Sequence, residues 1–376
     1  MRITPVIGTV LNVLTAVLVL ALPARAQMTP PRDALDGIDP VVLLTQGKEV
    51  SGKPDFKVSR GKFDYLFVSA ENKAAFEKNP EKYEIQLSGA CARMGGGVTG
   101  NPADFAVVDG KIYIFGSDDC HKKFVAAPAK FLPRPVPAMP TAARDVQAGR
   151  ALLDKAVASV GGAAKIDAVT SYIETATQTQ TRPQGQMALT VKTIRRFPAD
   201  IRIERTMAMG DRTQTSAQLM TAEGGWFING TNAYPQNPEG RTTNEQEYSR
   251  ALIPLLRARS GATFQAAAVP SAVVDGVAED RVRVKDKLVD ITIGLDKQTG
   301  QVHSLSFVGR NMDAEIGDYT IVLSDYRDVN GLKLPFSERA LFNGQPDEFR
   351  TRQIKTFEIN PAIDPALFRA PATGGQ

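Results

Sequence analysis

The chain has 376 residues, of which 43% are hydrophobic and 23% are charged, and its formal net charge is +4. A balance this small, without a block of Lys and Arg interleaved with aromatics, excludes a nucleic-acid-binding surface. The length exceeds what one hydrophobic core normally organises, so it predicts two domains.

The first 26 residues predict an export signal. Arg2 supplies the charged start, residues 10–22 are mostly apolar, and Ala24-Arg25-Ala26 forms a small-x-small cleavage site. The apolar run is shorter than the ~20 residues that a transmembrane helix needs. No later stretch is apolar enough to span a membrane. We therefore expect a mature chain that is periplasmic or secreted and has no transmembrane segment.

Residues 34–131 predict a small α+β domain with an internal repeat. The stretch Tyr65–Phe76, YLFVSAENKAAF, returns as Tyr113–Phe124, YIFGSDDCHKKF. Each copy predicts an aromatic strand, a Ser N-cap and a helix of two to three turns. Because one copy is too small to form a core, we expect the two copies to pack on each other.

This region resembles the YHS domain family. The resemblance rests on Gly37–Val41 with Gly47-Lys48, on YLFVSAENKAAFEKNPEKY and on Ser88–Ala92. It implies a small treble-clef-like module, and relatives of this kind include metal-binding ones. In the first copy, however, Val68, Asn72 and Lys73 stand where a metal ligand would be expected.

The chain has two cysteines, and both fall in this domain. Cys120 lies in the first turn of the helix that Ser117 is expected to cap, where backbone N–H groups favour a thiolate. Three interpretations remain open. An oxidising compartment favours a structural disulfide between Cys91 and Cys120. Thiolate, thioether and imidazole would suit a copper or zinc site made by Cys91 and Cys120 with Met94 or His121. The third interpretation is two thiols without a shared role.

Neighbouring helix residues point about 100° apart, which counts against Cys120 and His121 binding one ion together. The glycine-rich stretch Ala92–Asn101 lacks the ending of a phosphate-binding loop and predicts a flexible loop. Residues 132–144 carry four prolines and predict a semi-rigid linker.

The second domain is expected over residues 145–376. A helix is predicted over Asp145–Val160, ending at Gly161-Gly162, and an amphipathic helix over Asn244–Arg259. Between and after them, runs of alternating apolar and polar residues are typical of antiparallel strands with one covered face. The predicted fold class is α+β: the small repeated module plus a curved antiparallel sheet, an unclosed half-barrel with helices on its concave face.

This part resembles the superfamily of the outer-membrane lipoprotein chaperone LolA and related lipoprotein-sorting proteins. The resemblance rests on residues 161–176, 295–307, 324–344 and 357–371. It implies an open barrel whose partner is an apolar small molecule, a lipid or a lipoprotein acyl chain.

The candidate ligand-binding residues are apolar residues of this domain: Ile194, Phe197, Ile203, Trp226, Phe227, Leu252 and Leu256. The same residue types also fill cores, which is the competing interpretation. The arginines of one strand pair are candidates for an anionic headgroup or for a solvated face: Arg195, Arg196, Arg202 and Arg205.

No sequence motif indicates an enzyme. The chain lacks a nucleophile elbow, a phosphate-binding loop, a dinucleotide fingerprint and a His-Glu-x-x-His motif. His303 lies in an alternating stretch far from His121 and is expected to face solvent or a neighbouring strand. We therefore hypothesise an exported, non-enzymatic binding protein, a carrier or sensor of a lipid-like ligand. The alternative is a metal-binding or thiol-redox module that acts through Cys91 and Cys120.

Overall fold

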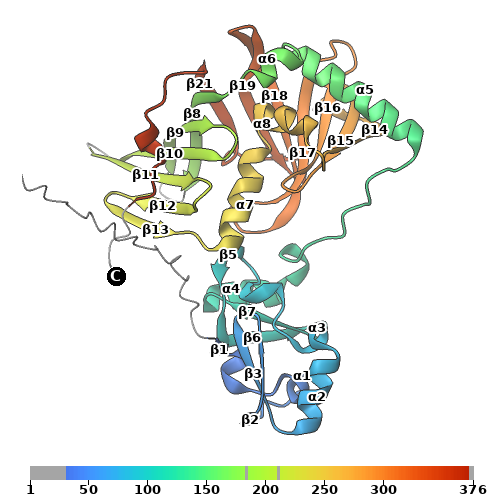
Figure 1. The fold of residues 1–376 in the computed structure, drawn as a ribbon, viewed down its shortest axis with the longest axis vertical. Coiled ribbons are helices and arrows are strands. Elements are labelled where there is room, and N and C mark those ends of the chain that lie inside the picture. The colour runs from blue at the N-terminus through green and yellow to red at the C-terminus, as the bar shows by residue number, and fades with distance from the viewer. Residues whose placement is uncertain (1–30, 183–184, 210–211, 372–376) are drawn as a thin grey trace, which may run out of the picture.

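The computed structural model describes residues 31–182, 185–209 and 212–371, so the predicted signal peptide lies outside the described residues. The chain forms a small N-terminal module, residues 31–131, and a large antiparallel sheet with its helices, residues 143–371 (Figure 1). Within the described ranges, no helix is long and apolar enough to cross a bilayer.

The N-terminal module contains two small sheets with short helices beside them. One sheet has the order β1-β3-β2 and the other the order β5-β4-β7-β6. The strands are β1 (Arg32–Asp33), β2 (Lys53–Arg60), β3 (Phe63–Phe67), β4 (Ala90–Cys91), β5 (Gly95–Thr99), β6 (Asn101–Val108) and β7 (Lys111–Phe115). The helices are α1 (Pro40–Gln46), α2 (Ala70–Lys78), α3 (Pro80–Tyr83) and α4 (Asp118–Ala126).

The two strand–helix units of the module have matching backbone geometry. The hairpins β2–β3 and β6–β7 each contain one register shift. Ser69 and Ser117 cap α2 and α4 by accepting a hydrogen bond from the backbone N–H three residues later. A loop before each hairpin contains three successive left-handed residues, Leu35-Asp36-Gly37 in one and Leu87-Ser88-Gly89 in the other.

β5 lies within the stretch that predicts a flexible loop, and that prediction is wrong. Its residues pair with β4, and the strand packs beside α7 (Pro238–Ser249). A Cβ on Gly96 would lie 2.9 Å from the Cβ of Glu239. Glycine therefore serves here for close approach between strand and helix, a requirement that local propensity does not reveal.

The described part of the large sheet has fourteen strands, and all of its pairings are antiparallel. Their order is β13-β12-β11-β10-β9-β8-β21-β19-β18-β17-β16-β15-β14, and β20 pairs with β19. The strands are β8 (Ser171–Arg182), β9 (Gly185–Arg196), β10 (Asp200–Met209), β11 (Arg212–Met220), β12 (Gly225–Asn229), β13 (Asn232–Pro235), β14 (Gln265–Val274), β15 (Val277–Lys285), β16 (Asp290–Asp296), β17 (Val302–Arg310), β18 (Ile316–Val329), β19 (Leu332–Phe342), β20 (Gln345–Pro346) and β21 (Arg352–Ile359).

Along the chain, the first strands run from the middle of the sheet to one edge, and the later strands run from the opposite edge back to the middle. β8 lies next to β21, and β9–β13 extend the sheet to one edge. α7 and α8 (Leu252–Arg257) then carry the chain to the other edge, from which β14–β19 return (Figure 1). β13 and β14 are the two edge strands, and they do not pair with each other. The described sheet is therefore an unclosed barrel. The predicted curved antiparallel sheet with helices is confirmed.

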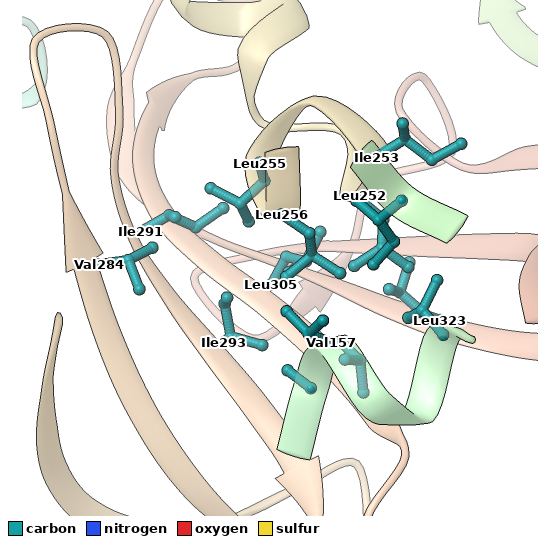
Figure 2. Packing of buried hydrophobic residues seen from close by; sticks show 14 of the residues in the cluster. Val157, Leu252, Ile253, Leu255, Leu256, Val284, Ile291, Ile293, Leu305 and Leu323 are labelled. Carbon is teal, nitrogen blue, oxygen red and sulfur yellow. The ribbon is translucent and has the colours of Figure 1, made fainter. Parts of the chain in front are cut away.

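The main core lies between the concave face and the helices α5 (Ala143–Val160), α6 (Ala163–Asp167) and α8. Figure 2 shows Leu252, Leu255 and Leu256 of α8 close to Val157 of α5 and to Ile293 and Leu305 of the sheet. All of these side chains are buried. Burial of this apolar surface stabilises the contact between helices and sheet.

One predicted helix is two helices. The sequence predicts a single helix over Asn244–Arg259, but α7 ends at Ser249 and α8 begins at Leu252. The ring of Pro254 would clash with the carbonyl group of Arg250 in a continuous helix. The break places Pro254 in the first turn of α8, where proline is tolerated.

Residues 133–142, most of the predicted linker, form no helix or strand, but they do contact the sheet. Arg283 donates to the carbonyl oxygen of Pro137 over 2.7 Å, and Arg134 forms an ion pair with Asp318 over 2.8 Å. The module also touches the sheet directly, because Arg310 donates to the carbonyl oxygen of Arg93 over 2.7 Å.

Candidate functional site

A cavity of about 420 Å³ lies between α7 and the concave face, where β8–β11 approach β17–β19 and β21. Its volume falls in the range of ~300–1,000 Å³ that is common for small-molecule sites. Strand alternation builds the apolar wall, since Ile201 and Ile203 project to the same face of β10. The apolar side chains that line it include Leu189, Val191, Ile201, Ile203, Leu305, Phe307 and Ile321.

Charged side chains line the rest of the cavity. Arg352 in β21 donates to Glu174 in β8 over 2.7 Å and to Glu338 in β19 over 3.0 Å. Glu174 is only 7% exposed, and this burial raises the pKa of its carboxyl even though Arg352 opposes the shift. Burial lowers the pKa of the Arg352 guanidinium, but the two carboxylates outweigh this effect, so the net shift of the pKa is upward. One arginine thus compensates the charges of two carboxylates, of which Glu174 is the more deeply buried.

α7 covers this cavity through polar contacts. None of its residues is buried. Glu247 pairs with Arg250 over 2.9 Å and with Arg350 in the turn before β21. The Tyr248 hydroxyl donates to Gln218 and accepts from Arg205 over 3.0 Å. Without a buried apolar side chain, this helix contributes little hydrophobic energy to its docking.

The cavity lining carries one excess positive charge. Its arginines are Arg205, Arg250, Arg350 and Arg352, and its carboxylates are Glu174, Glu247 and Glu338. Three of the arginines are paired with these carboxylates. Arg205 instead donates to the neutral groups of Gln218 and Tyr248, and the described residues offer it no ion pair. It is therefore the cationic group of this lining best placed to meet an anion.

The structure brings only one of the seven predicted ligand-binding residues to the cavity, namely Ile203. Ile194 and Trp226 pack with Phe368 in a separate cluster. Phe197, Leu252 and Leu256 belong to or pack against the main core. Phe227 is 39% exposed.

The four candidate arginines divide between the two faces. Arg205 lines the cavity, and Arg195 donates to the carbonyl oxygen of Tyr248. Arg196 pairs with Asp200, and Arg202 pairs with Glu204.

Sequence reasoning missed Glu174, Arg352 and the polar side chains of α7. A signal was present for Glu174, because alternation places it on the same strand face as Tyr172 and Ala176. A carboxylate on an otherwise apolar face requires a partner. The sequence does not show that Arg352 is that partner.

The cysteine cluster lies apart from the cavity, inside the N-terminal module. Cys91 and Cys120 are buried free thiols. The ring of His121 is held by Asp104 over 2.5 Å and stacks on Phe115. Met94 is 38% exposed, and its sulfur lies 3.7 Å from an Arg93 guanidinium nitrogen. Over the described residues, no three His, Cys, Asp or Glu side chains gather into a group that could hold a metal.

His303 pairs with a buried carboxylate two strands away. Its Nδ1 lies 2.6 Å from Glu279, which is fully buried, and a Cβ on Gly294 in the intervening strand would overlap Glu279. His303 itself is 14% exposed at its side chain. Because Gly294 has no side chain, Glu279 and His303 can reach each other across its strand.

No protein-family model matches the chain, and no curated protein matches it either. Several solved structures match the chain at low sequence identity. A LolA superfamily protein from Nitrosomonas europaea is 10% identical with a TM-score of 0.40, over 59% of this chain and 97% of that one. A DUF1329 family protein from Desulfovibrio piger ATCC 29098 is 9% identical with a TM-score of 0.40, over 60% and 97%. Likenesses this distant carry no inference about the ligand of this chain.

Proposed function

We propose that the protein is an exported, non-enzymatic carrier or sensor, periplasmic or secreted, that holds one amphipathic ligand in the concave cavity. The observation that carries this proposal is the two-sided lining of the cavity. Apolar side chains of β9, β10, β17 and β18 face a hydrocarbon chain, and Arg205 faces its polar end. The ligand class is a lipid or acyl chain with an anionic head. We assign the N-terminal module to the YHS-like type, with a role separate from this cavity.

The apolar wall supports the hydrocarbon part of this ligand. Ile203 and Leu305 are 1% and 4% exposed, and they line space that no side chain fills. Burying each methylene of a ligand there contributes about 0.8 kcal/mol. α7 is the expected entry side, since none of its residues is fully buried and it is held by the half-buried ring of Tyr248 and by polar contacts that water can replace on opening.

Ile203→Trp is expected to weaken binding of a fluorescent fatty acid about tenfold, because the indole occupies the ligand's space. The measurement is a fluorescence titration on the purified protein, with native mass spectrometry to detect co-purified lipid. Val308→Trp is the matched control, since Val308 follows the cavity residue Phe307 in β17, is 37% exposed and does not line the cavity. Equal affinity in both variants and the parent, or no probe binding at all, would contradict the proposal.

Arg205→Met is expected to weaken binding of the fatty acid about tenfold while leaving the corresponding fatty alcohol unaffected. A hydrogen bond to a charged group contributes about 1.5–3 kcal/mol, which the neutral alcohol does not receive. Arg202→Met is the control on the same strand, because Arg202 pairs with Glu204 and lies outside the cavity lining. An equal loss of affinity for the acid and the alcohol would mean that Arg205 supports the shape of the cavity. It would contradict the proposal that the ligand has an anionic head.

A further inference from the structure

The two cysteines occupy positions that correspond to a hydrogen-bonded pair in the first unit of the module. Asp39 follows the loop glycine Gly37 by two residues, and Cys91 follows Gly89 by two. Asn72 follows the helix cap Ser69 by three residues, as Cys120 follows Ser117. The loops are held alike: the N–H of Gly52 donates to the carbonyl oxygen of Gly37 over 2.8 Å, and Gly100 donates to Gly89 over 3.0 Å.

In the first unit, side chains fasten the loop to the helix. The Asn72 amide donates to the Asp39 carboxylate over 2.8 Å. In the second unit, Cys91 and Cys120 are buried in one apolar cluster, and the Cys91 thiol is among the groups that lower the pKa of the Cys120 thiol. The positions that the Asp39–Asn72 hydrogen bond joins in the first unit are therefore held by two thiols in the second, and a disulfide there would join the corresponding loop to the corresponding helix.

Cationic groups surround the thiol pair. Arg93 is 9% exposed, its Nη1 lies 3.8 Å from the Cys120 sulfur, and its buried Nε has no hydrogen-bond partner. Arg310, whose guanidinium binds the carbonyl oxygen of Arg93, also lies close enough for the Cys91 thiol to influence its pKa. A positive surrounding favours thiolates and disfavours a bound cation. Among the described residues, no three His, Cys, Asp or Glu side chains gather into a group that could hold a metal ion, so the donor set fits a copper or zinc ion poorly.

We propose that Cys91 and Cys120 form a dithiol–disulfide couple that exchanges with low-molecular-weight disulfides. The Cys120 thiolate attacks one sulfur of the disulfide RSSR and expels one thiolate, which leaves as RSH after taking a proton. The Cys91 thiol then gives up its proton and attacks the Cys120 sulfur, and the second RSH leaves. Two protein thiols are oxidised to one disulfide while RSSR is reduced to two RSH.

The roles of the two sulfurs follow from their positions. Cys91 is fully buried, whereas Cys120 is 6% exposed at the start of α4. Burial raises the pKa of the Cys120 thiol, but hydrogen bonds with Ser117, Arg93 and Cys91 outweigh it and lower the pKa. Cys120 is therefore the sulfur that meets the oxidant, and Cys91 is the sulfur that resolves the mixed disulfide.

The test is equilibration of the protein with glutathione at varied ratios of its disulfide and thiol forms, followed by acid quenching, alkylation and intact mass measurement. We expect the parent chain to pass in one two-electron step from two alkylated thiols to none, with a mass two hydrogen atoms lower. Cys91→Ser is expected to stop at a stable mixed disulfide on Cys120. Two thiols that stay alkylatable at the most oxidising ratio, a lasting glutathione adduct on the parent, or a metal released on denaturation would overturn the proposal.

Arg93→Met provides a second readout. Glutathione disulfide is expected to react several-fold more slowly with Cys120 at pH 7 in this variant, because one pKa unit changes the thiolate fraction up to tenfold. Lys123→Met is the matched control: both cations pair with Asp119, but only Arg93 contacts the sulfur. Equal rates of reaction with glutathione disulfide in the parent and both variants would mean that Arg93 does not activate Cys120. They would contradict the assignment of Cys120 as the attacking sulfur.

Discussion

Arg352→Met is expected to lower the free energy of unfolding at pH 7 by about 3 kcal/mol. The change leaves Glu174, 7% exposed, and Glu338 without their shared cation, and an uncompensated buried charge costs about 3–5 kcal/mol. Some of this cost is relieved because the Arg352 side chain is 22% exposed and lets water reach the site. Urea unfolding of the parent and the variant measures the difference.

The effect should depend on pH with a defined sign. The folded-state pKa of Glu174 is raised above its ordinary value, so its contribution to stability is present at low pH and is lost as pH rises through the folded pKa. Without Arg352 this pKa rises further. The difference between variant and parent should therefore be largest at a pH above the raised pKa of Glu174 and shrink as pH falls through it, because Glu174 then takes up a proton.

Arg339→Met is the matched control for this prediction. Arg339 lies next to Glu338 in β19 and pairs with Asp275, but both partners are about 40% exposed. Exposed ion pairs contribute about 0–1 kcal/mol. A loss of similar size in both variants, or a loss for Arg352→Met that does not change with pH, would contradict the assignment of a buried charge network.

Gly149→Ala is expected to destabilise the protein by about 2 kcal/mol, although helix propensity predicts the opposite sign. Gly149 lies inside α5, where alanine normally stabilises by about 1 kcal/mol. Its new Cβ would lie 2.4 Å from the Cα of Ala267 and 2.6 Å from the backbone nitrogen of Ala268 in β14. Backbone atoms of a paired strand cannot move aside cheaply, so α5 must shift away from the sheet, and such overpacking costs about 1–3 kcal/mol or more.

The thermal and urea unfolding of Gly149→Ala should be compared with those of Gly97→Ala. A Cβ on Gly97 meets nothing within 4 Å, so that variant should change stability by less than about 0.5 kcal/mol. A stabilised Gly149→Ala protein would mean that α5 does not approach β14 this closely.

Local sequence patterns determined much of the fold. Alternation along stretches such as Asp200–Met209 predicts antiparallel strands, and the structure has a strand with these bounds. Gly161 after the α5 periodicity predicts the end of that helix, which the structure places at Val160. These features depend on the dihedral preferences and side-chain spacing of a few neighbouring residues, so a short window contains the information.

Local patterns did not predict which face of the sheet lines the cavity. Ile203 and Thr193 are register partners in β10 and β9, so Ile194, the next residue along, projects to the opposite face. There it meets Phe368 of the C-terminal turn Pro365–Phe368. Both faces of this part of the sheet are apolar because each is covered by a different segment. Alternation alone therefore could not say which isoleucine lines the cavity.

Sequence by itself determined the antiparallel strands, the end of α5 and the similarity of the two strand–helix units, because each depends on residues close together in the chain. Only the tertiary structure decided which groups meet. It places Arg352 against Glu174 and buries Cys91 and Cys120 in one cluster, and it leaves Arg205 without an ion pair among the described residues. Each of these contacts is set by strand order and register, and the energy of a charge or a thiol depends on the partner that the fold delivers.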